Sequence, residues 1–185
     1  MNFDKLIRTR KSTKKFKSTK PDWRDIIEAV DAARFAPMAG GIYTLKFIVI
    51  EDEEKIKKIT AACQQDFVAQ AKYLVVVCSN PSLTKNAYGS KGEVYCRQQA
   101  GSGIQNFWLK LVEKKLSTCW VGYFVGSMIK ETLKIPENIN IEAVFPIGYE
   151  YEKPIEKKAK INIDSILYFE TYGNKKMKPE KKLSA

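Results

Sequence analysis

The basic segment near the N-terminus carries the side chains with the clearest chemical potential. Arg10, Ser12 and Lys14 alternate along a stretch that we expect to be extended, because Phe16 is its one apolar residue. In an extended chain, alternate side chains project to one side at intervals of about 7 Å. A guanidinium, a hydroxyl and an ammonium in such a row form a good cradle for a phosphate group. By its spacing alone, however, such a triplet is more often a solvated basic arm than a binding site.

Two further stretches could supply backbone N–H groups to a ligand. The segment Ala36–Gly41 is predicted to be a loop whose two glycines accept backbone angles and close approaches that other residues do not. The second stretch is a short apolar strand that is expected to end at Gly122. Each of these features by itself is more often an ordinary turn.

The chain of 185 residues predicts one domain, because it is long enough to bury a sizeable core. Its formal net charge of +11 includes eight basic side chains between Lys5 and Lys20 and a second cluster at Lys157, Lys158 and Lys160. An anionic partner would suit these two patches, although a solubilising surface accounts for most of the lysines. Nucleic acid is a weaker candidate, because zinc-finger spacing, an RRM-type aromatic motif and a clear helix-turn-helix pattern are all missing from the sequence.

The absence of histidine excludes catalysis by a Ser-His-Asp or Cys-His arrangement. The cysteines are widely spaced without a C-x-x-C pair, which predicts free buried thiols rather than a disulfide framework or a zinc site: Cys63, Cys78, Cys96 and Cys119. We therefore expect no metal. No apolar run approaches the about 20 residues of a membrane span, and Met1–Arg10 lacks the apolar stretch of a signal peptide. These features predict a cytoplasmic protein.

Hydrophobic periodicity predicts the elements that position these residues. Helices are predicted at Asn2–Thr9, from Asp22 to Pro37, at Glu53–Ala62, along a stripe from Ile104 to Val112, and at Met128–Leu133. Strands are predicted at Leu45–Glu51, Tyr73–Ser79, Leu116–Val121, Ile141–Gly148 and Ile163–Tyr172, of which Tyr73–Ser79 has the unbroken apolar run of a central strand covered on both faces. Strands among alternating helices indicate an α+β or α/β fold with helices around one sheet. The polar stretch Leu83–Gly92 is predicted to be a loop and a candidate lid.

A run of tiny residues, Ala100–Gly103, lies just before the apolar stripe that begins at Ile104. Each glycine inside a helix costs about 0.5–1 kcal/mol relative to alanine, so something must approach this helix closely. A neighbouring helix of the same chain and a second copy of the chain in a dimer are equally good explanations.

Several of these stretches, in this order along nearly the whole chain, resemble motifs of the FMN-dependent nitroreductase family. Its opening R-x-S-x-[KR]-x-F motif is similar to Arg10–Phe16, and its A-P-S-x-x-N loop is similar to Ala36–Gly41. Gln105–Leu109 is similar to its I-Q-N-L-L helix, and Ser117–Gly122 is similar to the strand after that helix. Further along, Leu133–Pro136 resembles its L-G-I-P element, Phe145–Tyr149 its P-x-G-Y/H strand, and Lys158–Lys160 its late K-x-R.

The resemblance implies an α+β protein of the nitroreductase-like fold, with a central mixed β-sheet surrounded by helices. It implies a homodimer with FMN sites at the subunit interface, in which residues 1–173 form the FMN-binding domain. The charged composition of residues 174–185 predicts a disordered tail. It further implies an oxidoreductase in which NADH or NADPH reduces FMN, and a small-molecule acceptor such as a nitroaromatic or a quinone then takes hydride in a ping-pong cycle. The flavin would carry this chemistry, and neither nucleic acid nor a membrane is an expected partner.

The same resemblance assigns the residues of the site. Basic and hydroxyl side chains would hold the phosphate and the ribityl chain: Arg10, Lys11, Ser12, Lys158 and Lys160. Lys14 would lie by the flavin N1 and C2 carbonyl, where a cation favours the anionic reduced ring. The other subunit would contribute the loop residues Pro37, Met38, Ala39 and Gly41. The flavin N5, which exchanges hydride, would face backbone N–H groups of Val121, Gly122 and Tyr123.

The sequence also departs from the family pattern. Met38 and Gly41 stand where serine and asparagine are usual, so two polar contacts to the flavin ring or the ribityl hydroxyls are lost or are replaced by backbone groups. Gln99 replaces a common aspartate. Lys11 and Lys160 stand for arginines, which keeps the charge but weakens bidentate phosphate binding. We therefore expect a modest affinity for FMN.

These departures leave alternatives open. One is a flavin-binding protein of the same fold without efficient turnover, and another is a basic nucleic-acid-binding domain. Specialised chemistries of the family, such as reductive dehalogenation or flavin fragmentation, also stay open. The residues that could shape an acceptor pocket, although each is as readily explained by packing, are Tyr43, Phe67, Tyr88 and Phe124.

Overall fold

The computed structural model describes residues 2–151 and 161–177 of the chain. The chain divides into two compact units, Met1–Glu152 and Lys153–Ala185. The second basic cluster, with Lys158 and Lys160, and the C-terminal residues 178–185 lie outside the described residues, so the expectations for them stay predictions. None of the helices in the described ranges has the length and apolar character that crossing a membrane requires.

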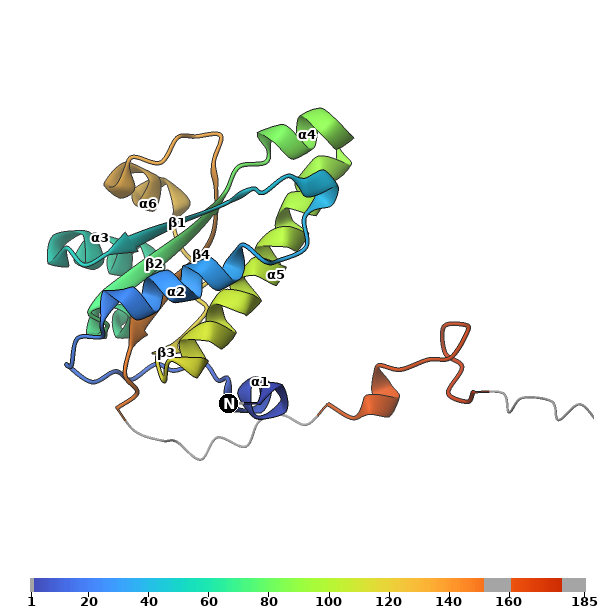
Figure 1. Cartoon of the computed structure of the whole chain (residues 1–185). Coiled ribbons are helices and arrows are strands. Elements are labelled where there is room, and N and C mark those ends of the chain that lie inside the picture. The colour runs from blue at the N-terminus through green and yellow to red at the C-terminus, as the bar shows by residue number, and fades with distance from the viewer. Residues whose placement is uncertain (1, 152–160, 178–185) are drawn as a thin grey trace, which may run out of the picture. The chain divides into compact units, whose positions relative to one another are not determined.

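The first unit is built on a sheet with the strand order β1-β2-β4-β3 (Figure 1). Its strands are β1 (Leu45–Ile50), β2 (Tyr73–Ser79), β3 (Ser117–Thr118) and β4 (Asn140–Gly148). Neighbouring strands pair antiparallel, and a parallel bridge between Ser12 and Thr118 adds the N-terminal segment to the edge. Every residue of β2 is buried, which confirms the predicted central strand.

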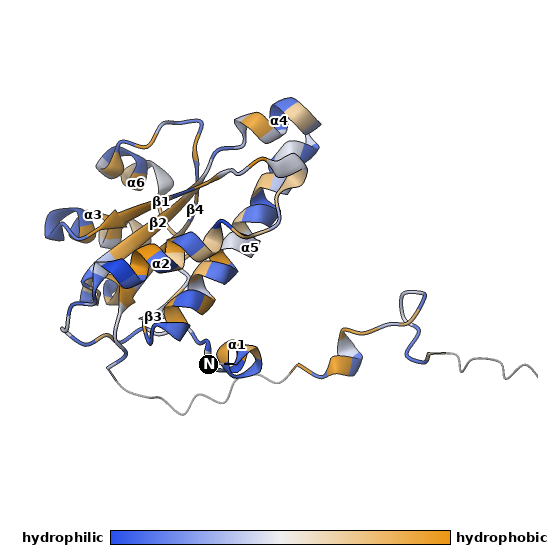
Figure 2. Cartoon of the chain, viewed as in Figure 1, coloured by the Kyte–Doolittle hydropathy of each residue, from blue (hydrophilic) through white to orange (hydrophobic). Residues whose placement is uncertain are grey.

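Helices cover both faces of this sheet (Figure 1). The helical elements of the unit are α1 (Phe3–Thr9), α2 (Trp23–Ala33), η1 (Ala39–Gly41), α3 (Glu53–Cys63), η2 (Asp66–Gln70), α4 (Ser82–Tyr88), α5 (Lys91–Glu113) and α6 (Gly126–Leu133). Because side chains alternate along a strand, Val75 and Val77 of β2 pack in one core cluster with α2 and α5, whereas Leu74 and Val76 pack in the other with α3 and α6. Figure 2 shows the strands as largely apolar and the helices as mixed. The predicted α+β class is confirmed.

Helix α4 corrects the prediction of a loop at Leu83–Gly92. The side chain of Asn80 accepts a hydrogen bond from the N–H of Ser82 at 3.0 Å, and the Thr84 hydroxyl donates to the carbonyl of Pro81 at 2.9 Å. The helix ends at Gly89, whose φ of 58° suits a helix terminus. Start and stop signals thus outweigh the polar composition of this stretch, and α5 begins at Lys91.

Two predicted strands also differ from the structure. Of Leu116–Val121, Ser117–Thr118 is a strand and Val121 forms an isolated bridge, because Pro146 of β4 has no N–H and its carbonyl instead accepts from the Thr118 hydroxyl at 2.7 Å. The prediction of a strand at Ile163–Tyr172 is wrong. Here a 3₁₀ turn, η3 (Ile163–Ser165), begins where the Asn162 side chain accepts from the N–H of Asp164. The described part of the second unit holds no strand with which this segment could pair.

The tiny residues of α5 allow close packing within the chain. A Cβ atom on Gly103 would lie 2.5 Å from Cδ1 of Leu45 in β1 and 3.4 Å from the carbonyl oxygen of Ala33 in α2. A Cβ on Gly101 would meet no atom within 4 Å. Close contact within the chain therefore explains why residue 103 is a glycine. It does not explain the glycine at position 101.

The two glycines form a matched pair for a stability test. In Gly103→Ala the new methyl group must displace the buried Leu45 side chain, and overpacking of this kind costs about 1–3 kcal/mol. Gly101→Ala gains the same helix propensity without that cost. We expect the free energy of unfolding of Gly103→Ala, measured in urea, to lie about 1–3 kcal/mol below that of Gly101→Ala. Equal stability of the two variants would contradict the packing described here.

Candidate functional site

The segment that carries Arg10, Ser12 and Lys14 is fixed to the edge of the sheet. The N–H of Thr13 donates to the carbonyl of Thr118 at 2.9 Å, and the N–H of Lys17 donates to the carbonyl of Tyr149 at 2.8 Å. Phe16 is buried, and a Cβ on Gly148 would lie 3.0 Å from Cδ1 of its ring. The structure thus has the extended conformation and the single apolar anchor that the sequence predicted.

Arg10 and Lys14 each lie over an aromatic ring. The guanidinium carbon of Arg10 is 4.4 Å from the ring centroid of Trp108 in α5, and the Lys14 ammonium is 5.6 Å from the centroid of Phe67 in η2. Among the described residues, neither cation forms an ion pair with a carboxylate. Both positive charges are therefore held by π-faces and remain available to an anion.

Ser12 lies between these two cations and meets the thiol of Cys119, which directly follows β3. Burial raises the pKa of the Cys119 thiol, while the charge of Lys14 and a hydrogen bond from Ser12 act in the opposite direction. Both side chains that oppose the shift must lie close to Cys119. The structure therefore brings Arg10, Ser12 and Lys14 together along the Thr118–Val121 edge.

Lys11 projects to the other side of the segment. Its ammonium forms an ion pair with Glu150 at 2.6 Å, and both side chains are largely shielded from solvent. This charge is already balanced within the chain, which sets Lys11 apart from Arg10 and Lys14. Its predicted part in phosphate binding remains a prediction.

Val121, Gly122 and Tyr123 follow the same edge. Val121 exchanges both of its backbone hydrogen bonds with Val144 in β4, at 3.0 Å each. The next two residues are exposed, and their N–H groups donate to no acceptor in the part of the chain that the structure describes. Two unused donors thus stand beside the row of cations, in a position to bind a polar ligand atom.

The glycine loop lies elsewhere in the chain. Gly40 and Gly41 have φ angles of 58° and 71°, and a Cβ on Gly40 would lie 2.3 Å from the hydroxyl oxygen of Tyr88. The ring of Tyr88 packs edge-on against Tyr95, near the start of α5. Trp108, beneath Arg10, is 13 residues further along this helix, which corresponds to about 20 Å. Within one chain, Pro37–Gly41 and the cation row therefore lie near opposite ends of α5 (Figure 1).

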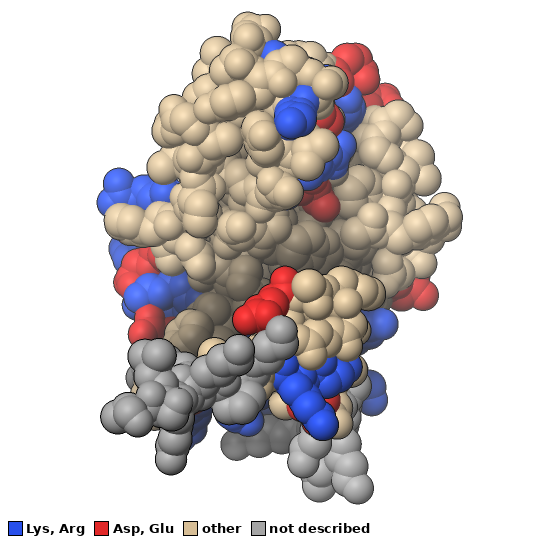
Figure 3. All heavy atoms as spheres, turned by 90° about the vertical axis from the view of Figure 1, so that its right-hand side faces the viewer, with Lys and Arg blue, Asp and Glu red and all other residues tan. Residues whose placement is uncertain are grey.

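The surface around the glycine loop carries exposed apolar side chains. They come from the region after α2, the loop, α4 and the start of α5: Phe35, Met38, Leu83, Tyr88 and Val94. Figure 3 faces this side of the molecule, and the upper part of the view is mostly uncharged, with a few Lys, Arg, Asp and Glu side chains among the uncharged residues. Clustered apolar surface of this kind is typical of an interaction site.

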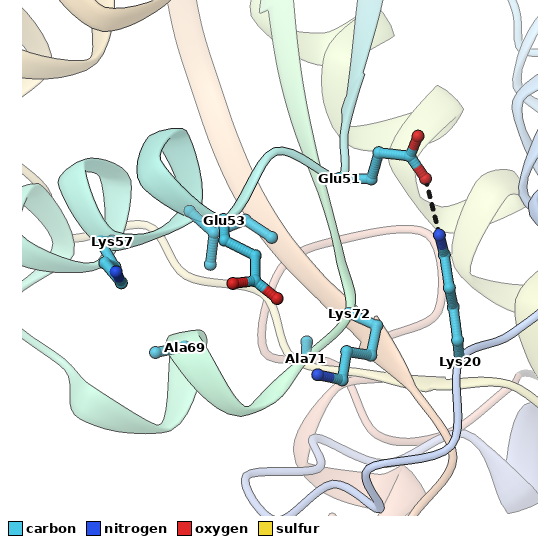
Figure 4. A pocket seen from close by; sticks show the side chains of 8 residues that line it. Lys20, Glu51, Glu53, Lys57, Ala69, Ala71 and Lys72 are labelled. Atoms are coloured by element: carbon cyan, nitrogen blue, oxygen red, sulfur yellow. Dashed lines mark hydrogen bonds and ion pairs between the residues drawn. The ribbon is translucent and has the colours of Figure 1, made fainter.

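A separate pocket of about 420 Å³ lies beside η2 and α3 (Figure 4). It is lined by Lys20, Glu51, Glu53, Ile56, Lys57, Ala69, Ala71 and Lys72. Lys20 and Glu51 form an ion pair across it at 2.8 Å. Its three lysines are largely offset by two carboxylates. None of the residues predicted to bind FMN lines this pocket, so we place the candidate site at the cation row.

Sequence reasoning missed three residues of this site. Trp108 and Cys119 were expected simply to be buried, and Thr118, whose carbonyl accepts from Thr13, had no assigned role. The Ser117–Gly122 motif could have indicated that this region belongs to the site. The contacts of these residues with the N-terminal segment could not be read from the sequence, because they span about a hundred residues of chain. Phe67, in contrast, was already a candidate pocket residue.

The first unit is thus an antiparallel sheet covered by helices, with Arg10 and Lys14 along one edge. A model described as the Nitroreductase family matches residues 7–66 and 60–149. The chain therefore belongs to the nitroreductase family.

Individual relatives agree with this assignment. A protein of Archaeoglobus fulgidus with the provisional name NADH dehydrogenase/NAD(P)H nitroreductase is 29% identical over 150 residues, which cover 78% of this chain and 83% of the relative. The solved structure of a nitroreductase family protein from Clostridium novyi NT has a TM-score of 0.74 at 27% identity, with 94% and 96% of the two chains covered. A structure described as an FMN-dependent nitroreductase from Clostridium difficile R20291 shares the fold, with a TM-score of 0.76, 22% identity and coverage of 90% and 98%.

Thiol reactivity tests the burial of the core on the α3 and α6 side of the sheet. Burial raises the pKa of the Cys63 and Cys78 thiols to about 11 from an ordinary value of 9.0. Because the thiolate is the reactive form, about one such thiol in a thousand is ionised near pH 8, against about one in ten at the ordinary value. A disulfide reagent should therefore modify the native protein slowly at this pH, and faster as the pH rises. Four thiols should react at once after unfolding in guanidinium chloride. Rapid modification of Cys63 or Cys78 in the native state would contradict the structure.

Proposed function

We propose that this chain is an FMN-dependent oxidoreductase that uses NADH or NADPH to reduce a small acceptor such as a nitroaromatic or a quinone. The observation that carries the proposal is the row of Arg10, Ser12 and Lys14, fixed to the sheet edge with no carboxylate against either cation in the described residues. Membership of the nitroreductase family supports it. The names of relatives support NAD(P)H as donor and FMN as cofactor.

The residues present suit the phosphate end of FMN. Arg10 offers a planar fork of donors for phosphate oxygens, and the hydroxyl of Ser12 can donate beside it. Lys158 and Lys160, outside the described residues, are expected to join them. Trp108 holds the guanidinium of Arg10 by stacking, which lowers the entropy lost when a phosphate binds.

The isoalloxazine end would lie against Lys14 and the segment after β3 that contains Gly122 and Tyr123. Lys14 places a positive charge where it would stabilise negative charge on the reduced ring, and Phe67 holds that ammonium in place. The free N–H groups of Gly122 and Tyr123 would donate to the ring edge. When bound, FMN supplies hydride transfer at N5. The chain itself needs to bind, orient and shield the ring, which agrees with a sequence that has no histidine.

We further propose that a second copy of the chain completes the site. Pro37–Gly41 lies about 20 Å along α5 from Arg10, and a second copy could bring its own loop to a ligand that is held at Arg10. The exposed apolar residues around the loop, including Phe35 and Met38, would be covered in a homodimer.

Flavin binding and reduction test the proposed activity. The purified protein, reconstituted with FMN and desalted, should keep the visible absorbance of an oxidised flavin, and anaerobic NADH or NADPH should bleach it. Loss of all flavin on desalting would refute the proposal. Retained flavin that neither nicotinamide reduces would instead favour a flavin-binding protein without turnover. The presence of Met38 where the family usually has serine is the reason to consider that alternative.

Two variants of the basic segment locate the site. Arg10→Met keeps the stacking surface on Trp108 but removes a charge-assisted contact worth about 1.5–3 kcal/mol, so the dissociation constant for FMN should rise about tenfold or more. Lys15→Met removes an exposed charge from the opposite side of the same segment and should leave it within about twofold. Titration of apo-protein by quenching of flavin fluorescence measures both. Equal effects of the two variants would indicate general attraction by net charge rather than a site at Arg10.

A further inference from the structure

Gln99 is a buried amide in the middle of α5 that bonds to a different part of the chain. It is 4% exposed. Its amide oxygen accepts from the N–H of Thr44 at 2.7 Å and from the Thr44 hydroxyl at 2.5 Å. Its amide nitrogen donates to the carbonyl of Ile42 at 3.2 Å. All three bonds thus go to the short segment that links the glycine loop to β1.

This linking segment makes few backbone hydrogen bonds to other parts of the backbone. Between Gly41 and Leu45 the backbone lies in neither helix nor strand, and Thr44 is buried, so unpaired backbone groups there would be costly. The carbonyl of Thr44 accepts from the N–H of Asn80 at 2.9 Å. Gln99 supplies the partners for the N–H of Thr44 and the carbonyl of Ile42. An amide both accepts and donates, whereas a carboxylate could accept from Thr44 but could not donate to Ile42.

The loop is also held at its apex. The hydroxyl of Tyr88 occupies the space where a Cβ of Gly40 would lie, 2.3 Å from that position, and the ring of Tyr88 rests on Tyr95 of α5. The backbone of the loop is therefore fixed at its exit by Gln99 and at its apex by Tyr88. Both residues belong to the α4–α5 pair.

We infer that Gln99 is a positioning residue, which sets where Met38 and its neighbours present themselves to the flavin of a second copy. This inference rests on the proposed function. Without the amide, the N–H of Thr44 and the carbonyl of Ile42 lose their partners and the loop exit must shift to find others. A loop that contributes to a ligand site across an interface loses its contacts after displacements of about 1 Å.

Three variants test the role. Gln99→Met keeps the length and the apolar stem of the side chain but makes none of the three hydrogen bonds. Gln99→Glu keeps an acceptor for Thr44, and Gln98→Met makes the same exchange at the exposed neighbour on the same helix. In full-length protein, we expect the dissociation constant for FMN to rise about tenfold in Gln99→Met, less in Gln99→Glu, and by less than about twofold in Gln98→Met.

A second readout separates positioning from loss of stability. A variant that merely unfolds more easily binds less FMN, but the flavin that it binds has the wild-type visible absorption and circular dichroism spectrum. Displacement of the loop should change that spectrum in Gln99→Met and restore it in part in Gln99→Glu. If Gln99→Met does not fold, Thr44→Val removes the hydroxyl bond alone and should produce the same spectral change at a smaller loss of affinity.

The possible outcomes are distinct. A wild-type dissociation constant and an unchanged spectrum in Gln99→Met, or in Thr44→Val if that variant takes its place, would overturn the positioning role while leaving the proposed function intact. Failure of the wild-type protein to bind FMN would instead overturn both.

Discussion

The hydrogen bond from the N–H of Thr13 to the carbonyl of Thr118 is the contact on which the candidate site depends. β3 is a two-residue edge strand, and such an edge leaves unpaired backbone groups unless something covers it. The N-terminal segment covers it, and the pairing fixes which side chains face outward. Because the side-chain period of an extended chain is two, Arg10, Ser12 and Lys14 share one side, while Thr13 is buried and Lys11 turns back to Glu150. A slip of one residue would exchange these roles.

Helix α5 sets the second constraint, which is distance. Its 23 residues carry Trp108 beneath Arg10 near one end and Tyr95, with the packed Tyr88, near the other. Rigid packing through Gly103 against β1 keeps the helix in place. One copy of the chain therefore holds the cation row and the glycine loop about 20 Å apart along α5. The same separation would let two copies form two equivalent sites, because in a symmetric dimer each copy contributes the same two regions.

The parts of the fold that local chemistry determines could be predicted from the sequence. The apolar run of β2 and the Asp22 cap of α2, whose carboxylate accepts from the N–H of Arg24, are examples. Composition gave the wrong prediction at α4, where short-range hydrogen bonds determine the structure. Ile163–Tyr172 is rich in β-branched and aromatic residues, but among the described residues it has no partner strand. The row at Arg10 was readable because alternation is local. The role of Gln99 was not, because its partner Thr44 is 55 residues away and a lone glutamine in a helix gives no signal.

The most direct test of a site shared between two chains is the flavin content of a mixed dimer. One chain carries Arg10→Met. The other, with a different affinity tag, carries Gly40→Val, in which a β-branched side chain is strained at a φ of 58° and its Cβ lies in the space of the Tyr88 hydroxyl. Each variant alone should retain almost no FMN after desalting. If the site is shared, one of the two sites in the mixed dimer combines both defects and the other has none, so about half of the wild-type flavin content should return. A mixed dimer as empty as its parents would contradict the shared site, since it would mean that Arg10 and the glycine loop serve the same flavin from the same chain.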